Sequence, residues 1–131
     1  MSSSDSPIRD FMTPSVHTIS MESTLPEARA LMEKLGIRHL PVLDGSKLVG
    51  LLSDRDLARM EGFPMIDFNL VAVPDAMSDE PYVVAPETPA LEVFRTMRDN
   101  RYGSAIVSDG KAIIGVFTTT DALRVLVDQM S

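Results

Sequence analysis

Two short stretches of the chain combine a hydroxyl with a carboxylate at the same spacing. In "VGLLSDRDL" Ser53 is followed three residues later by Asp56, and in "IGVFTTTDAL" Thr118 is followed by Asp121. Such a pair can form a capping box, in which each side chain accepts a hydrogen bond from the other residue's backbone N–H at the start of a helix. It can also bind a nucleotide, because free N–H groups at a helix start suit a phosphate and a carboxylate accepts both hydroxyls of a ribose. The spacing alone leaves both interpretations open.

The two corners belong to a longer internal repeat, which has to be recognised before any fold is assigned. Shifting the sequence by 65 positions aligns residues 8–60 with residues 73–125 without a gap, and 11 of the 53 pairs are identical. The sequence therefore predicts a disordered tail at 1–7, a first repeat at 8–60, a linker at 61–72 and a second repeat at 73–130. The identical pairs are Asp10/Asp75, Met12/Met77, Glu22/Glu87, Glu27/Glu92, Met32/Met97, Val42/Val107, Asp44/Asp109, Gly45/Gly110, Gly50/Gly115, Asp56/Asp121 and Arg59/Arg124.

Each copy predicts the element order β-α-β-β-α. A short strand at 16–19, or 82–84 in the second copy, precedes a helix whose apolar residues recur at three and four positions. The stretches "HLPVLDGSKLVGLL" and "SAIVSDGKAIIGVF" each place two β-rich runs around Asp-Gly, which is typical of a hairpin. A second helix is expected to begin near Asp54 and near Thr119. Each corner hydroxyl would then follow a buried strand directly.

Further local signals concern the helix starts and the linker. Ser23 or Thr24 is the expected N-cap of the first helix, and Thr88 is expected in the second copy, with Pro89 at the first helical position. The apolar residues of the linker predict that it packs against the protein; they are Phe63, Ile66, Phe68 and Leu70.

Composition and charge narrow the function classes. With 131 residues, 44% hydrophobic and 24% charged, the chain has a globular composition, and its sequence contains neither cysteine nor an apolar run of the ~18 residues that span a bilayer. We therefore expect a cytoplasmic protein. The formal charge of −7 argues against nucleic acid and against anionic membranes. Residues 8–60 hold seven acids and seven Lys or Arg, and residues 73–125 hold eight and five, so an anionic ligand should favour the first half.

Residue types that support catalysis are scarce. His17 and His39 are the only histidines, and without cysteine they do not make a zinc site. No Ser-His-Asp arrangement, P-loop or dinucleotide glycine fingerprint is present. The methionines fit core packing, at positions 12, 32, 77 and 97. The sequence therefore predicts no enzyme, no catalytic cofactor and no metal site.

The duplicated unit resembles the CBS domain, named for cystathionine β-synthase, over almost the whole chain. The resemblance lies in the gapless repeat and in the corner pattern, glycine followed by hydroxyl-x-x-Asp. It implies a Bateman module, with an α/β (α+β) fold in which two β-α-β-β-α repeats pack sheet to sheet with approximate two-fold symmetry. It also implies an adenine nucleotide bound in the cleft between the repeats, and a homodimer. The expected dimer contact includes the apolar residues Leu57, Leu123, Leu126 and Val127.

The resemblance assigns roles to particular residues. It implies that Ser53 and Thr118 face phosphate and that Asp56 and Asp121 take the ribose hydroxyls. Basic residues before the second strand of the unit meet phosphates in the family, and here these are Arg38 and His39, whereas the second copy has Gly103 and Ser104. The base would be walled by Thr13 and Thr18, or by Ser78 and Val83. Thr18 and Val83 fit an ordinary strand equally well.

The expected function is that of a regulatory or sensor module that binds AMP, ADP or ATP. S-adenosylmethionine and dinucleotides stay open, because they share the adenosine. The regulated protein is not identified by the sequence. The alternative is a structural or protein-interaction module whose nucleotide sites are vestigial and whose corners serve only as helix caps.

Overall fold

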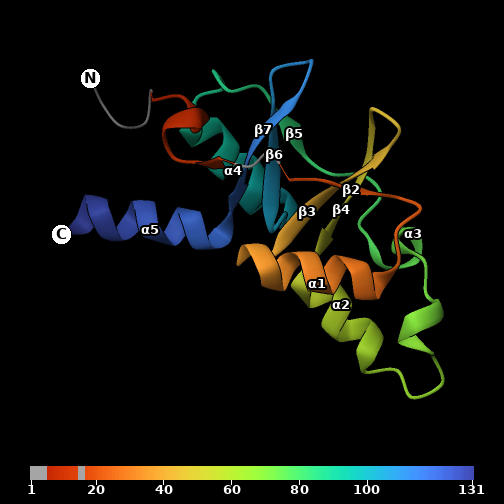
Figure 1. Cartoon of the computed structure of the whole chain (residues 1–131). Helices are drawn as coiled ribbons and strands as arrows, with labels where there is room; N and C mark the ends of the chain where they lie inside the picture. The colour runs from red at the N-terminus through yellow and green to blue at the C-terminus, as the bar shows by residue number, and fades with distance from the viewer. Residues whose placement is uncertain (1–5, 15–16) are drawn as a thin grey trace. The chain divides into compact units, whose positions relative to one another are not determined.

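The computed structural model describes residues 6–14 and 17–131 and has the mixed α/β composition that the sequence predicts (Figure 1). The chain forms two compact units. The first unit contains residues 17–81. The second contains residues 82–131 together with residues 6–14.

The first unit is a three-stranded sheet with helices. The strand order is β2-β3-β4, with β2 parallel to β3 and β3 antiparallel to β4. In chain order its elements are β2 (Ile19–Ser20), α1 (Leu25–Leu35), β3 (His39–Asp44), β4 (Lys47–Ser53), α2 (Asp54–Glu61), η3 (Phe68–Leu70) and α3 (Val73–Ala76).

The second unit repeats this plan with one more strand. Its sheet has the order β1-β7-β6-β5, in which β5 is parallel to β6 and the other pairs are antiparallel. In chain order its elements are η2 (Ile8–Asp10), β1 (Thr13–Pro14), β5 (Val83–Val84), α4 (Ala90–Asn100), β6 (Ser104–Ser108), β7 (Ile113–Thr118) and α5 (Thr119–Met130).

The predicted order β-α-β-β-α is confirmed in both copies, and so are the starts of α2 at Asp54 and α5 at Thr119. Both hairpins turn at the expected Asp-Gly, where Gly45 and Gly110 have φ of 63° and 92°, a region that glycine enters without strain. In the second turn the Asp109 carboxylate accepts backbone N–H groups, which lowers its pKa. The expected strand residue Val16 lies outside the described residues.

The helix caps follow the prediction in one copy only. Thr24 caps α1, and its hydroxyl and the Glu27 carboxylate form a capping box. The prediction for Thr88 is wrong, because α4 begins at Ala90 and Pro89 takes the N-cap position without a side-chain bond. The N-terminal stretch explains the difference: the carbonyl of Ser6 accepts from the N–H of Ala90 at 2.8 Å, so backbone replaces the missing side-chain cap.

Both units have a core of equivalent residues. Val42 and Val107 are fully buried at the same position of β3 and β6. Leu40 pairs with Leu52 across the first hairpin, whereas Ala105 pairs with Phe117 across the second. All four side chains are fully buried. The first unit thus fills this space with two leucines, and the second fills it with a small alanine and a large phenylalanine. The core volume stays similar.

The lead segment of each sequence repeat packs on the other copy. Ile8 is fully buried in the core of the second unit, and Val73 is fully buried in the core of the first. Thr13 pairs with Val116, and 65 residues later Ser78 pairs with Leu51 in the same antiparallel sense. Neither repeat of the sequence is therefore a complete compact unit. The sequence predicts a disordered tail at 1–7. Residues 1–5 of it lie outside the described residues, whereas Pro7 is ordered and forms an antiparallel bridge with Pro89.

Each lead segment that packs on the other copy is called an exchanged segment, and the glycine retained in both corners makes room for it. A Cβ built on Gly50 would lie 2.4 Å from the sulfur of Met77 and 2.7 Å from the carbonyl oxygen of Ser78. A Cβ built on Gly115 would lie 2.4 Å from the sulfur of Met12 and 2.9 Å from the carbonyl oxygen of Thr13. Only glycine allows the exchanged segment to approach this closely.

The linker is less packed than its composition predicts. Phe68 in η3 contacts the first core, and the guanidinium of Arg29 lies over its ring at 5.8 Å from the centroid. Leu70, however, is 83% exposed, and Phe63 and Ile66 are also exposed. The prediction that all four apolar residues pack holds for Phe68 alone, because the short η3 directs only that side chain onto α1 and the core.

Candidate functional site

The first corner joins β4 to α2 and is held by a complete capping box. The hydroxyl of Ser53 accepts from the N–H of Asp56 at 3.1 Å, and the carboxylate Oδ2 of Asp56 accepts from the N–H of Ser53 at 2.9 Å. Oδ1 of Asp56 accepts from the guanidinium of Arg59 at 3.0 Å. Asp56 is 8% exposed, so a charged group lies almost buried at a strand end.

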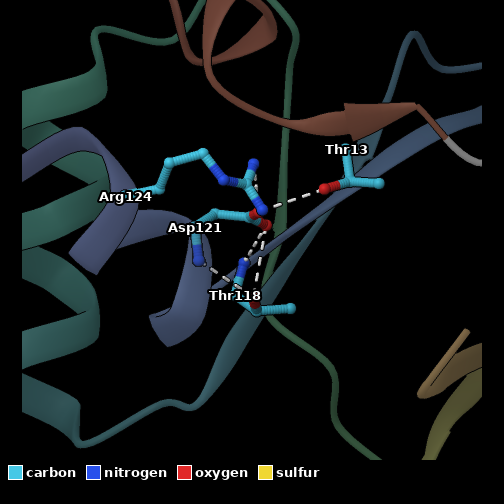
Figure 2. A network of polar contacts seen from close by, with 4 residues as sticks. All are labelled: Thr13, Thr118, Asp121 and Arg124. Atoms are coloured by element: carbon cyan, nitrogen blue, oxygen red, sulfur yellow. Dashed lines mark hydrogen bonds and ion pairs between the residues drawn. The ribbon is translucent and has the colours of Figure 1, made fainter. Parts of the chain in front are cut away.

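The second corner joins β7 to α5 with the same capping box (Figure 2). The hydroxyl of Thr118 accepts from the N–H of Asp121 at 3.3 Å, and Oδ2 of Asp121 accepts from the N–H of Thr118 at 2.9 Å. Oδ1 accepts from the guanidinium of Arg124 at 3.0 Å. Figure 2 shows one further bond that comes from β1: the hydroxyl of Thr13 donates to Oδ1 at 3.0 Å.

The two carboxylates differ in how many hydrogen bonds they already accept. An ionised carboxylate offers about four lone-pair positions. Oδ2 of Asp121 accepts from both the N–H and the hydroxyl of Thr118, and Oδ1 accepts from Thr13 and Arg124. All of its positions are used. Within residues 6–14 and 17–131, Asp56 accepts only from Ser53 and Arg59, which leaves about two positions for another donor.

The exchanged segments bring one predicted site residue to each corner. Thr13 and Ser78 occupy equivalent positions beside β7 and β4, but the sequence repeat assigns each to the other copy. Thr13 therefore lies at the second corner, and Ser78 belongs to the unit that holds the first. In the described part of the chain no hydrogen bond joins Ser78 to Asp56, in contrast to the bond from Thr13 to Asp121.

The predicted phosphate ligands lie at the first corner. The carbonyl of Arg38 accepts from the N–H of Asp54 at 2.9 Å, so its backbone adjoins the start of α2. The Arg38 side chain is 78% exposed and forms a long ion pair of 4.0 Å with Asp54. His39 is paired in register with Ser53. The carbonyl of Gly103 takes the place of Arg38 at the second corner.

The remaining two predicted site residues lie at the other edge of each sheet. Thr18 directly precedes β2, which is the edge strand opposite β4. Val83 lies in β5, the edge strand opposite β1, and is 45% exposed. Neither residue is joined to its corner by a hydrogen bond within the described residues.

Two arginines belong to the corners although the sequence reasoning gave them no role. Arg59 and Arg124 follow the two aspartates by three residues, one helical turn later, and pair with them from side chains that are 57% and 60% exposed. The available signal was that both are identical in the two repeats. Their exposed guanidinium groups neutralise the buried carboxylates and can turn outward to meet an anion.

Two features are absent from the described residues. These residues contain no group of three or more His, Cys, Asp or Glu side chains that could hold a metal ion. None of their helices combines the length and apolar character needed to cross a bilayer.

Comparison with known proteins places this geometry in a family. Residues 8–61 and residues 73–128 each match the CBS domain, so the chain belongs to the CBS domain family and carries two copies of the domain. The resemblance inferred from the repeat is thereby confirmed.

Two curated relatives differ in how much of them the chain covers. An inosine-5′-monophosphate dehydrogenase of Korarchaeum cryptofilum is 34% identical over 112 residues, which are 85% of this chain but 22% of the enzyme. A CBS domain-containing protein of Dictyostelium discoideum is 29% identical over 131 residues, 92% of this chain and 90% of the relative. The chain thus spans about a fifth of the dehydrogenase and most of the second relative.

Solved structures share the fold. A protein of Pyrococcus horikoshii superposes with a TM-score of 0.82 at 25% identity, over 95% of this chain and 94% of the other. The protein CBSX2 in complex with AMP superposes with a TM-score of 0.75 at 24% identity, over 96% of this chain and 99% of CBSX2. A CBS domain pair in complex with 5′-methylthioadenosine and S-adenosyl-L-methionine superposes with a TM-score of 0.81 at 21% identity, over 95% of this chain and 98% of the other. At these last two identities the likeness establishes the fold.

Proposed function

We propose that this CBS-domain pair binds an adenine nucleotide of the AMP, ADP or ATP type and acts as a regulatory sensor. Two proteins of the same fold have been crystallised with adenosine compounds, one with AMP and one with 5′-methylthioadenosine and S-adenosyl-L-methionine. Those likenesses establish the fold alone. The choice of ligand for this chain therefore rests on its own residues.

The observation that carries the proposal is the open acceptor capacity of Asp56. A buried carboxylate is costly unless hydrogen bonds satisfy it. Asp56 is 8% exposed and accepts from Ser53 and Arg59 only, within the part of the chain that the structure describes. The two vicinal hydroxyls of a ribose supply two donors, which equals the number of positions left. A diol can therefore bind here without displacing any protein hydrogen bond.

The surroundings of Asp56 suit the phosphate of the same ligand. The hydroxyl of Ser53 accepts from the N–H of Asp56, and within residues 6–14 and 17–131 its own proton has no acceptor in the protein, so it can donate to a ligand. Arg38 and Arg59 both present exposed guanidinium groups beside the start of α2, where the helix dipole also favours negative charge. The first corner thus combines acceptors for a ribose with donors for a phosphate.

The sensor would work by population shift: a nucleotide that contacts one arrangement of the protein better than another raises the population of that arrangement. We propose that the chain itself is not an enzyme, that it is cytoplasmic, and that it forms a homodimer. None of the groups at either corner is arranged as a nucleophile with an adjacent base, and the catalytic activity of the archaeal dehydrogenase is a property of that longer protein.

A panel of ligands tests the proposal. Melting temperature should rise with adenosine, AMP, ADP or ATP, because a ligand that binds only the folded state stabilises it. Arg38→Ala should leave adenosine unaffected and weaken AMP and ATP by roughly two- to fivefold, with the larger loss for ATP. Lys47→Ala, at the other end of β4, is the charge-matched control and should change none of them. No shift with any adenosine compound would contradict the proposal.

A second candidate function is that of a protein-interaction module. The helix α5 exposes four apolar residues in the second unit, which are Leu123, Leu126, Val127 and Met130. Exposed apolar residues gathered on one helix are typical of an interaction surface. In this case the corners would be helix caps, and the ligand panel would give no shift.

A further inference from the structure

We propose that the hydroxyl of Thr13 acts as a latch on the second corner: it occupies the carboxylate of Asp121 that a ribose would use, and so makes the two corners unequal. The inference rests on the proposed function, since it concerns which corner takes the ligand first.

The occupied positions of Asp121 give the first step. Oδ1 holds Thr13 and Arg124, and Oδ2 holds both donors of Thr118 (Figure 2). Asp121 is 3% exposed. A diol that needs two positions must displace two of these donors. Arg124 lies on the surface and moves easily, whereas the N–H of Thr118 is fixed by the backbone. The N–H and the hydroxyl of Thr118 both bond Oδ2, so it is the release of the Thr13 hydroxyl together with Arg124 that frees Oδ1 for a ligand.

The position of Thr13 is fixed before any ligand arrives. Its backbone pairs with Val116 in β1 and β7, and Met12 lies against Gly115 at the adjacent position. Ile8 anchors the same segment in the core of the second unit. Threonine is β-branched and has few side-chain rotamers, so little entropy is lost when its hydroxyl meets Oδ1. A hydrogen bond from such a pre-positioned donor to a charged acceptor is a strong competitor.

The first corner offers the natural comparison. Ser78 is the equivalent residue, and its backbone makes two hydrogen bonds of 2.9 Å with Leu51. Its side chain lacks the methyl group of Thr13, and no hydrogen bond from it to Asp56 is found among the described residues. The latch is thus a property of the second corner.

The consequence is an order of binding. The first corner takes a diol without releasing any protein bond, and the second takes it only when the Thr13 hydroxyl turns away. The second corner would then respond at a higher ligand concentration than the first, which widens the range of concentrations over which the protein reports.

Calorimetric titration of adenosine into paired variants tests the latch. In the Asp56→Ala background, which leaves the second corner as the intact one, Thr13→Val should raise the affinity for adenosine by about tenfold. The gain should be smaller for 2′-deoxyadenosine, because that ligand lacks the diol. Thr88→Val in the same Asp56→Ala background is the matched control, because it makes the same substitution in the second unit at a residue outside both corners, and it should leave affinity unchanged. Circular dichroism confirms that each variant is folded, and Thr13→Ala provides a second substitution at the same position.

The outcomes separate the latch from the function on which it rests. An unchanged affinity in Asp56→Ala/Thr13→Val, with adenosine bound by the wild type, overturns the latch alone. A weaker affinity overturns it too, and makes Thr13 a ligand of the ribose. Absence of binding in every variant and in the wild type overturns both the latch and the nucleotide site.

Discussion

The two corners of this CBS-domain protein share a capping box and differ in what surrounds it. Ser53 with Asp56 and Thr118 with Asp121 make the same pair of reciprocal bonds at the same junction of strand and helix. At the second corner the Asp121 carboxylate also accepts hydrogen bonds from the hydroxyls of Thr118 and Thr13. The first corner keeps acceptor positions open and adjoins Arg38, where the second has Gly103.

This difference shows that the motif alone does not define the site. Both corners match the same pattern of hydroxyl and carboxylate, so the cap and the proposed binding group are the same atoms. Whether the carboxylate can bind a ligand depends on donors that come from elsewhere in the chain. In the second unit such a donor arrives on the exchanged segment from the N-terminus. In the function proposed above, the fully satisfied cap stabilises the fold, and the partly satisfied one is the first to take the ligand.

The largest expected effect concerns stability. Asp121→Ala removes the acceptor of four donors at an almost buried position and should lower the free energy of unfolding by about 3 kcal/mol. Asp56→Ala removes a cap with fewer partners and should cost about 1 kcal/mol. Chemical denaturation of both variants measures the difference. Equal losses would show that the extra bonds to Asp121 do not matter in solution.

The glycines should behave alike, in contrast to the aspartates. Gly50→Ala and Gly115→Ala each place a Cβ against a methionine sulfur and a backbone carbonyl oxygen, and should cost about 1–3 kcal/mol each. Gly103→Ala, where nothing lies within 4 Å of the added Cβ, is the control. If one corner glycine tolerates alanine without loss, the exchanged segments do not approach both hairpins equally.

A smaller effect is expected where the helices α1 and α4 end. Gly36 follows α1 with φ of 65°, and the equivalent Arg101 follows α4 with φ of 57°. A non-glycine residue in this left-handed region is strained by roughly 1–2 kcal/mol. Arg101→Gly should therefore stabilise the protein by up to about 1 kcal/mol, after the extra backbone entropy of glycine is subtracted. Gly36→Ala is the reverse change and should destabilise. A melting temperature that falls in Arg101→Gly would contradict this reasoning.

Local features of the fold were predictable from the sequence. The hairpins follow from Asp-Gly between β-rich runs, and the starts of α2 and α5 follow from a hydroxyl ahead of an acidic residue. The Thr88 cap was predicted wrongly, because the Ser6 carbonyl that replaces it comes from a segment more than 80 residues away. No local pattern reports such a partner.

The repeat alone also did not predict that each lead segment packs on the other copy. The repeat assigns Thr13 to the first copy, whereas its hydroxyl donates to Asp121 of the second. A signal did exist, since Met12/Met77 and Gly50/Gly115 are identical pairs, and each methionine lies against the glycine of the other copy. The packing of the methionines in the cores was predicted and is confirmed for Met32 and Met97, which are buried. The roles of the corner residues in binding a nucleotide stay predictions.

Titration of adenosine into the wild type, Asp56→Ala and Asp121→Ala tests the central claim most directly. If the first corner is the open site, Asp56→Ala should weaken the tighter binding event by about ten- to a hundredfold, because charge-assisted hydrogen bonds to the ribose are lost. Asp121→Ala, checked by circular dichroism for its fold, should leave that event unchanged. A loss of the tighter event in Asp121→Ala, or its survival in Asp56→Ala, would contradict the account.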